Sequence, residues 1–348
     1  MLVSDFDFDL PAELIAQHPA PERTRSKLMV LDRGSGRITH SHTADIPAFL
    51  SAGDLLVVND TRVFPARLTG RRLPGGGVVE CLLLKRRGHG VWDALVHPGQ
   101  RLRPGSRMVF ERDAVVLHAE IVGRSSFGRR TIQFDIEDEE AFDRAVDRLG
   151  EVPLPPYIKR EPAGTDTARY QTVYARVRGS VAAPTAGLHF TPELLDQLQA
   201  RGVGHVALTL HVGYGTFQPV RTQLVEEHRI DPEPWSIDAD VAAAVNDAVS
   251  AGRRVVAVGT TTTRTLEAVA AAHGGRIAPG SGQTDLFIYP GFRFQVVSAL
   301  LTNFHLPGSS LLMLVAAFAG RELVLEAYRT AIDQRYRFYS YGDAMLIL

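Results

Sequence analysis

Residues 254–259 read RVVAVG and run directly into the hydroxyl-rich segment TTTTR at 260–264. A short run of β-branched residues that ends at a glycine predicts a strand that turns into a helix. One predicted helix, at about 238–251, precedes this strand, and another, at about 263–272, follows it. Helix, strand and helix in this order are typical of an α/β domain with a parallel sheet.

The same alternation extends over most of the chain after Gly150. Thr191 and Pro192 supply the N-cap and the first-turn proline of a helix that Gly202 ends. Further strands are predicted for four apolar runs, which are DLLVVND at 54–60, HVALTLHV at 205–212, DLFIYP at 285–290 and QVVSALL at 295–301. We therefore expect an α/β body whose sheet is mixed and mainly parallel.

A second region, between about residues 73 and 135, contains only strand signals. Its apolar runs are separated by turn residues, and five or six strands with no helix among them predict a small barrel or sandwich. The runs are VVECLLLKR at 78–86, VWDALVH at 91–97, SRMVFE at 106–111, AVVLHAEIVG at 114–123 and RTIQFDI at 130–136. We expect residues 1–69 plus 151–348 to form the α/β body and residues 70–150 to form an inserted small β-barrel domain.

The composition is that of a large globular protein. Of the 348 residues, 45% are hydrophobic, 22% are charged and one is a cysteine, which excludes a disulfide scaffold and argues against disorder. Cys81 lies among valines and leucines and is expected to be a small buried side chain. The acidic N-terminal segment does not resemble a signal peptide, and the apolar stretch 311–319 is about half of the roughly 20 residues that a membrane span needs. We expect a cytoplasmic protein without membrane contact.

Charge is segregated along the chain. The formal net charge is -1, but residues 62–135 hold 14 basic and six acidic residues, so this stretch carries +8 and the remainder -9. Nearly all of the positive charge is arginine, whose planar guanidinium binds phosphate and stacks on bases. The insert is a candidate RNA-phosphate surface, although charged strand faces are often only solvated and arginine usage can reflect genomic base composition.

Three loops follow predicted strands of the body, where α/β sheets place ligand sites at the carboxyl ends of their strands. They are HVGYGTF at 211–217, GTTTTR at 259–264 and TNFHLP at 302–307. The second would present backbone N–H groups and a positive helix dipole to a carboxylate or phosphate, unless its threonines only cap the helix. Gly213 and Gly215 permit close approach of a ligand but lack the third glycine of a dinucleotide fingerprint.

A fourth candidate segment combines small residues with aromatic ones. Residues 169–174 (RYQTVY) and 181–190 (VAAPTAGLHF) leave room for a ligand, and Tyr174, His189 and Phe190 could stack on a purine or face a sulfonium. A single histidine beside a phenylalanine is also commonly a structural residue. The sequence has no metal-ligand spacing, G-x-S-x-G motif or P-loop, so we expect no metal, and the hydrolase and NTPase classes lose their usual support.

Eight motifs then run in order from one end of the chain to the other. They are NDTRVFPARL at 59–68, GEVPLPPYI at 150–158, RYQTVYA at 169–175, GSVAAPTAGLHFT at 179–191, LHVGYGTFQPV at 210–220, GQTDLFIYPG at 282–291, LLTNFHLPGS at 300–309 and YRFYSYGDAMLI at 336–347. Together they resemble the S-adenosylmethionine:tRNA ribosyltransferase-isomerase family of queuosine biosynthesis. Each motif alone is weak, whereas eight in order are highly specific.

The resemblance implies a reaction, a fold and a partner. The ribosyl group of S-adenosylmethionine would be transferred and isomerised onto 7-aminomethyl-7-deazaguanine at the wobble position of tRNA, giving epoxyqueuosine-tRNA, adenine and methionine. S-adenosylmethionine would be a ribosyl donor and co-substrate, and tRNA the macromolecular partner. The implied fold is an α/β body with a β-barrel insert, and we expect a monomer.

The sequence departs from the family pattern at a few positions. Asp231, within HRIDPE at 228–233, stands where a histidine is typical of the family, which weakens any mechanism that needs a histidine there. Ser298 replaces a common aspartate, and Thr262 and Thr263 replace a common Ser-Val pair. These changes leave the resemblance intact.

The candidate site residues fall into three groups. Those for proton transfer, which the sequence does not rank, are His189, His211, His305, Glu227 and Asp285. Those for S-adenosylmethionine are Tyr174, Thr185, Gly187, Phe190, Gly213, Gly215, Thr216, Thr260, Thr261, Arg264 and Asn303, with Thr260, Thr261 and Arg264 assigned to the methionine carboxylate. Those for tRNA phosphates are Arg62, Arg67, Arg71, Arg72 and Arg169.

Two other function classes fit parts of the same sequence. One is a non-catalytic RNA-binding protein whose arginine-rich insert does the binding. The other is an RNA methyltransferase that uses S-adenosylmethionine, which the glycine-poor first loop weakly disfavours. The released product distinguishes the three function classes: adenine for the ribosyltransferase-isomerase, S-adenosylhomocysteine for the methyltransferase, and neither for the binding protein.

Overall fold

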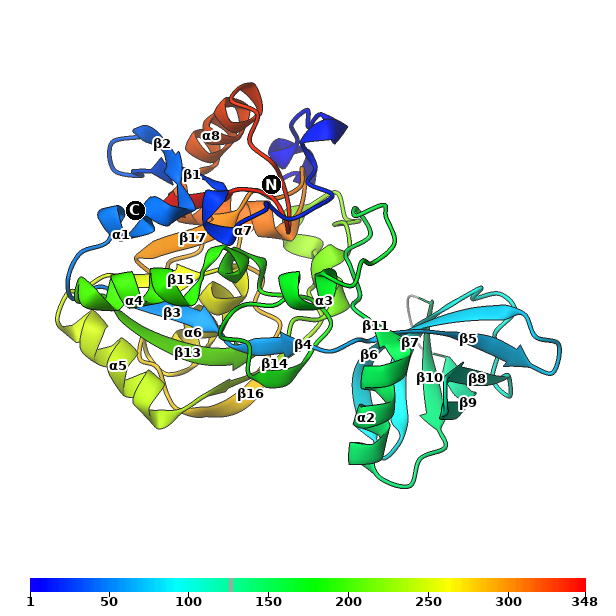
Figure 1. Ribbon diagram of the computed structural model, residues 1–348. Helices are drawn as coiled ribbons and strands as arrows, with labels where there is room; N and C mark the ends of the chain where they lie inside the picture. The colour runs from blue at the N-terminus through cyan, green and yellow to red at the C-terminus, as the bar shows by residue number, and fades with distance from the viewer. Residues whose placement is uncertain (125–127) are drawn as a thin grey trace. The chain divides into compact units, whose positions relative to one another are not determined.

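The structure is a computed structural model that describes residues 1–124 and 128–348. The chain forms two compact units (Figure 1). The first, which we call the body, comprises Met1–Arg62, Pro155–Arg160 and Arg169–Leu348. The second, which we call the barrel unit, comprises Val63–Leu154 and Glu161–Ala168.

The body is built on a nine-stranded mixed sheet in the order β16-β14-β13-β3-β15-β17-β18-β1-β2. Its strands are β1 (Lys27–Leu31), β2 (Ile38–His42), β3 (Leu55–Asn59), β13 (Gly204–Leu210), β14 (Glu233–Ile237), β15 (Val255–Val258), β16 (Gly280–Thr284), β17 (Ala299–Asn303) and β18 (Ala344–Ile347). The central strands β13, β3, β15 and β17 are all parallel to one another. The predicted mixed α/β fold is thus confirmed, with the parallel pairing concentrated at the centre of the sheet.

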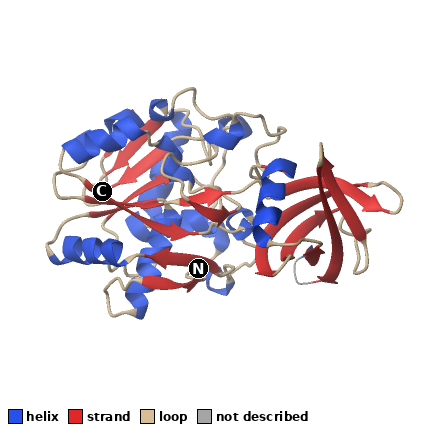
Figure 2. Ribbon diagram, turned by 60° about the horizontal axis from the view of Figure 1, so that its bottom comes forward, coloured by secondary structure: helices blue, strands red, loops and turns tan. Residues whose placement is uncertain are grey.

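Helices cover both faces of this sheet (Figure 2). The helices of the body are α1 (Ile46–Phe49), α4 (Pro192–Ala200), α5 (Ala239–Ser250), α6 (Thr260–Ala272), α7 (Ser310–Ala319) and α8 (Arg321–Asp333). Successive strand side chains point to opposite faces. Leu55 and Val57 of β3 therefore pack in the core formed with α5 to α8, and Leu56 and Val58 pack in the core formed with α1 and α4.

Several short elements complete the chain. The 3-10 helices are η1 (Val3–Phe6), η2 (Ala12–Leu14), η3 (Arg23–Arg25), η4 (Thr43–Asp45), η6 (Thr185–His189), η7 (Tyr214–Phe217) and η8 (Val225–Glu227). Strands β4 (Thr61–Val63) and β12 (Val177–Ser180) pair with each other, and α3 spans Asp166–Arg169. The apolar stretch 311–319 falls within the buried helix α7. Across the residues that the structure places, no helix combines the length and the apolar character needed to cross a bilayer.

The described residues of the barrel unit include six strands that form a closed barrel, because β8 pairs with both β9 and β5. The strands are β5 (Arg67–Leu73), β6 (Val78–Gly88), β7 (Val91–His97), β8 (Arg107–Arg112), β9 (Val115–Arg124) and β10 (Arg129–Phe134), with β11 (Gly150–Glu151) paired to β5. All five predicted strand runs are present. Cys81 is buried in this unit, as expected, and burial raises the pKa of its thiol to about 12.

The barrel unit also holds a helix that the sequence analysis did not identify, α2 (Glu139–Leu149). Its signals were present: Asp138 caps it by accepting from the Ala141 amide at 2.6 Å, and Phe142 and Val146 are spaced for one buried face. The unit also begins at Val63 rather than near residue 70. The reason is that β5 starts at Arg67 and pairs with barrel strands along its length.

Three predicted elements of the body differ from those observed. QVVSALL at 295–301 becomes a strand only from Ala299, where β17 begins. DLFIYP at 285–290 is not a strand; the polar segment just before it, β16, pairs with β14 instead. Helix α6 begins at Thr260, three residues earlier than predicted, because Gly259 serves as its N-cap. Gly259 has a φ of 90°, a conformation that glycine adopts without the steric cost of a side chain.

Candidate functional site

The body contains a cavity of about 680 Å³ at the carboxyl ends of its parallel strands. Val212 follows β13, Gly259 follows β15, and Thr302 and Asn303 end β17, and all four line the cavity. Residues 182–186, from the segment rich in small residues, form another part of the wall. The four segments that the sequence analysis singled out in the body therefore converge on one cavity.

Six of the candidate site residues line this cavity. They are Thr185, Thr216, Thr260, Thr261, Asn303 and His305. The remaining body candidates lie outside the lining, and their contacts show what they do instead.

The N-terminus of α6 faces this cavity. The first N–H groups of a helix have no partner within it, and Thr260 and Thr261 both line the wall. The threonines do not act as side-chain caps: the hydroxyls of Thr262 and Thr263 donate back to the carbonyl oxygens of Val258 and Gly259. The helix terminus is therefore available to an anionic group, as a carboxylate site requires.

Asn303 is fully buried in the wall and connects the cavity to His189. Its amide nitrogen donates to the carbonyl oxygen of Tyr339 at 3.1 Å and lies 3.3 Å from Nε2 of His189. His189 is itself buried, and burial, together with the charges of Arg337 and Arg23, lowers its pKa to about 4. Within the described chain, Oδ1 of Asn303 has no hydrogen-bond partner, and the atom itself is buried.

His305 is the one histidine among the described residues of the lining. Its Nε2 lies 2.8 Å from the Thr302 hydroxyl, and its backbone N–H donates to the Tyr328 hydroxyl at 3.0 Å. Burial lowers its pKa to about 3, so the ring is neutral at physiological pH. A neutral imidazole has a lone pair that can accept a proton, but a pKa this low makes it a weak base, so proton transfer to His305 needs an acidified substrate proton.

His211 lies behind the cavity wall rather than in it. Its Nδ1 is 2.8 Å from the Thr61 hydroxyl, which is also 2.8 Å from the Ser180 hydroxyl. Burial lowers the pKa of His211, and the nearby Asp60 acts in the opposite direction. A side chain at Gly179 would collide with this ring, so the imidazole is packed directly against the backbone. These contacts fix the His211 ring in place outside the cavity lining.

Arg264 does not line the cavity, contrary to its assignment to a carboxylate ligand. It is buried in an ion pair with Glu233, whose other oxygen accepts from the Gly213 amide at 2.8 Å. The Thr216 hydroxyl lies 3.5 Å from the same oxygen. The pair therefore joins helix α6 to the loop that contributes Thr216 to the cavity. Gly213 and Gly215 belong to that loop but are not themselves in the lining.

The residues assigned to stacking form part of the core. Phe190 is completely buried in the hydrophobic cluster on the α4 side of the sheet. Gly187 leaves space for Tyr174 rather than for a ligand, since a Cβ at Gly187 would lie 2.2 Å from the Tyr174 hydroxyl. Glu227 and Asp285 are exposed and do not line the cavity. Aromatic and acidic residue types alone did not show which side chains face inward.

The structure adds lining residues that the sequence analysis did not select. They are Asp7 near the N-terminus, Tyr157, Ser309, and the pair Tyr339 and Ser340. Tyr157 and Tyr339 stack with ring centroids 4.2 Å apart. Tyr157, Ser309, Tyr339 and Ser340 belong to motifs already quoted for the family resemblance, so those motifs contained the signal. Asp7 carried no such signal.

Four of the five arginines assigned to tRNA lie in or next to the barrel unit. Arg67 and Arg71 are paired with Glu80 and Glu111 at 3.1 and 3.0 Å. Arg62 is exposed and Arg72 is half-buried. Positive charge in this unit is therefore partly compensated by carboxylates on neighbouring strands.

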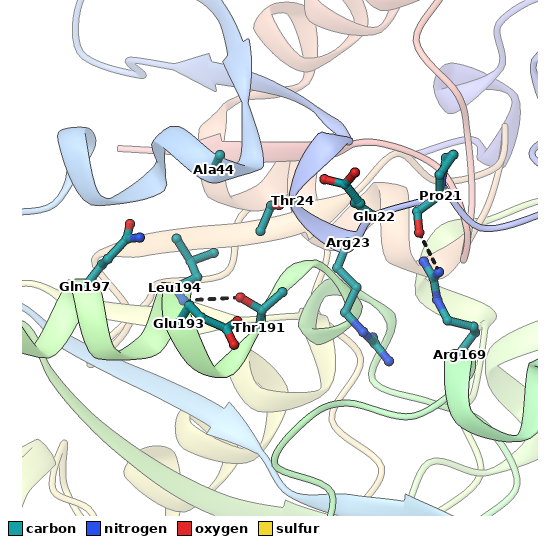
Figure 3. A pocket seen from close by; sticks show the side chains of 10 residues that line it. All are labelled: Pro21, Glu22, Arg23, Thr24, Ala44, Arg169, Thr191, Glu193, Leu194 and Gln197. Carbon is teal, nitrogen blue, oxygen red and sulfur yellow. Dashed lines mark hydrogen bonds between the residues drawn. The ribbon is translucent and has the colours of Figure 1, made fainter.

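Arg169, the fifth, lies in the body beside a second hollow of about 490 Å³ (Figure 3). Its guanidinium donates to the carbonyl oxygens of Pro21 and Ala20, which fixes its position. Arg23 lines the same hollow, and so do Glu22 and Glu193, so the charges there are mixed. Throughout the described chain, no three His, Cys, Asp or Glu side chains are grouped so that they could hold a metal ion.

Comparisons with known proteins cover the whole chain. Residues 3–347 match the family described as queuosine biosynthesis protein. The S-adenosylmethionine:tRNA ribosyltransferase-isomerase of Symbiobacterium thermophilum is 53% identical over 348 residues, which is 100% of both chains, and that of Caldanaerobacter subterraneus subsp. tengcongensis is 51% identical over 99% of both. The crystal structure of S-adenosylmethionine tRNA ribosyltransferase from Thermotoga maritima is 41% identical, matches with a TM-score of 0.56, and covers 99% of this chain and 100% of its own. With its α/β body, its six-stranded barrel and these full-length matches, the chain belongs to the queuosine biosynthesis protein family.

Proposed function

We propose that this protein transfers and isomerises the ribosyl group of S-adenosylmethionine onto 7-aminomethyl-7-deazaguanine at the wobble position of tRNA, releasing adenine and methionine. Family membership and the names of the relatives support this activity. The structural observation that carries it is the cavity of about 680 Å³, whose volume falls within the range of small-molecule sites. We propose that the ribosyl donor binds there.

The chemistry of the wall suits this donor. The methionine carboxylate would lie at the N-terminus of α6, where Thr260 and Thr261 line the wall. Asn303 adds a polar side chain to the wall, and its Oδ1 has no partner among the described residues. The sulfonium acidifies the hydrogens on the adjacent ribose carbon, and His305 is the neutral imidazole in the lining that could take one. The largely apolar wall would keep water from reactive intermediates.

Activity can be tested with purified protein, S-adenosylmethionine and tRNA that carries the aminomethyl base. We expect free adenine in solution and a matching mass increase of the tRNA. S-adenosylhomocysteine in place of adenine would indicate a methyltransferase, and tRNA binding without either product would indicate a binding protein. His305→Asn should retain donor binding and lose turnover, whereas full turnover of this variant would remove His305 from the proposed mechanism.

A further inference from the structure

The cavity has a buried floor and an exposed mouth. Gly259, Thr260, Thr261 and Asn303 are buried, whereas Ser4, Asp7, Pro156 and Pro219 are exposed although they line the same space. A small donor molecule can reach the floor. A base that remains attached to a tRNA chain has to approach from the mouth, so the two substrates meet different sets of residues.

Asp7 gives the mouth a charge that the rest of the wall lacks. It is the only carboxylate among the described residues of the lining, which include no lysine or arginine. His305 is neutral, as its low pKa shows. A cation entering the cavity therefore finds one carboxylate, at the mouth.

The backbone holds Asp7 in position. The backbone amide of Phe8 donates to the carboxylate of Asp7 at 3.0 Å, and the backbone amide of Asp7 donates to the carbonyl oxygen of Ser4 at 3.1 Å. The preceding residue, Phe6, accepts a bond from Gly308, which also lines the cavity. The carboxylate is therefore anchored to the cavity wall rather than placed on a free terminus.

An aromatic surface lies in the same cavity. The half-buried Tyr157 stacks on Tyr339 and makes an edge contact with Phe217 at a centroid distance of 6.2 Å. A hydrogen bond between the hydroxyls of Tyr157 and Ser340 fixes the ring. Aromatic faces stack on unpaired bases whatever their sequence, at a gain of about 1–3 kcal/mol per base.

We propose that the mouth of this cavity is the subsite for the acceptor base, and that Asp7 pairs with the ammonium of its aminomethyl group. The inference rests on the proposed function and adds a residue that selects the modified base. A primary alkylamine resembles the lysine side chain and is protonated at neutral pH. A base without the aminomethyl group makes no such pair, so Asp7 distinguishes the two.

The donor is the less suitable partner for Asp7. The methionine end of S-adenosylmethionine, with its carboxylate, is assigned to the N-terminus of α6 at the floor of the cavity. The aminomethyl cation, in contrast, enters on a macromolecule from outside. Charge, exposure and the aromatic faces in the same cavity therefore point to the acceptor.

The test compares Asp7→Asn with Asp9→Asn, a neighbouring exposed aspartate that does not line the cavity. Dissociation constants are measured for two tRNAs, one with the aminomethyl base and one with guanine at that position, and separately for S-adenosylmethionine. Wild type and Asp9→Asn should bind the aminomethyl tRNA about tenfold more tightly than the guanine tRNA, and Asp7→Asn should bind both equally. All three proteins should bind S-adenosylmethionine alike.

A preference for the aminomethyl tRNA that persists in Asp7→Asn would overturn the inference. A wild type without any preference, or a loss of donor binding in Asp7→Asn, would overturn it too. The binding measurements need no turnover, and the proposed function is tested separately by adenine release from the wild type. A wild type that releases adenine while Asp7→Asn keeps its preference would refute only the role of Asp7.

Discussion

Asn303 and His189 meet through the amide nitrogen of one and the Nε2 atom of the other, 3.3 Å apart. The same amide nitrogen donates to the Tyr339 carbonyl oxygen, which fixes the orientation of the amide because a carbonyl can only accept. Nε2 of His189 must then be the acceptor, so the ring is neutral and its lone pair is already engaged. His189 is thus a positioning residue for Asn303 rather than a proton acceptor for substrate.

This arrangement predicts different outcomes for two substitutions of His189. His189→Gln keeps a hydrogen-bond acceptor near the position of Nε2, whereas His189→Leu removes it. Loss of one such bond costs about 1 kcal/mol, so we expect His189→Leu to lose about five- to tenfold in kcat/KM, and His189→Gln to stay within about threefold of wild type. Steady-state kinetics of adenine release measures both. Equal and severe losses in the two variants would restore His189 as a proton-transfer residue.

Buried histidines also predict how stability depends on pH. His189 and His305 have pKa values lowered to about 4 and about 3, against 6.5 for an unhindered imidazole. Below pH 6.5 the unfolded chain therefore binds protons that the native state does not, and stability is lost as pH falls toward these lowered values. Between pH 7 and pH 5 each histidine should cost about 2 kcal/mol.

Urea unfolding at pH 7 and pH 5 measures this cost. The difference between the two pH values should shrink by about 2 kcal/mol in His305→Asn. His205→Asn, at an exposed histidine, is the matched control and should behave as wild type. An unchanged pH difference in His305→Asn would show that His305 is not the neutral, buried ring described above.

The sequence predicted the architecture well because the relevant signals are local. A strand that ends just before Gly259 and a helix that follows it are both encoded within a few residues, as are the five strand runs of the barrel. The strand predicted for DLFIYP was wrong. Its apolar side chains, Leu286, Phe287 and Ile288, pack on the core, but its backbone does not pair with a strand of the sheet. Apolar character alone does not distinguish the two environments.

The candidate site was predicted less completely for a different physical reason. The loops after the strands converge because parallel strands share a carboxyl edge, and that follows from topology. Which histidine faces the cavity depends on side-chain packing: His305 lines it, whereas His189 lies behind Asn303. Asp7 and Tyr339 reach the cavity from opposite ends of the chain, a proximity that no local pattern encodes.

The buried ion pair of Arg264 and Glu233 predicts that the stability of the protein depends strongly on both side chains. Among the described residues, Nε and Nη1 of Arg264 have no hydrogen-bond partner, so the guanidinium depends on Glu233 for compensation. Glu233→Gln would leave this charge unpaired in the interior and should destabilise the protein by about 3 kcal/mol. The double variant Arg264→Met with Glu233→Gln removes both charges and should be more stable than Glu233→Gln alone. Urea unfolding of the four proteins in the cycle measures the coupling, and simple additivity of the two substitutions would contradict it.

Some exposed arginines of the barrel unit are paired with a carboxylate and others are not. This difference predicts how much each arginine contributes to tRNA affinity. Arg107 is paired with Glu120 at 3.1 Å, whereas the described residues give no carboxylate partner to the exposed Arg101, Arg103 and Arg124. Each phosphate contact adds about 0.9 to the slope of log affinity against log salt in duplex nucleic acid and about 0.7 in single strands.

Replacing Arg101, Arg103 and Arg124 together by alanine should therefore lower that slope by about 2 and weaken binding at low salt. Arg107→Ala should change it less, because its charge is already shared with Glu120. Dissociation constants measured across a salt series provide the slopes, and a triple variant with the wild-type slope would place the tRNA backbone elsewhere on the protein.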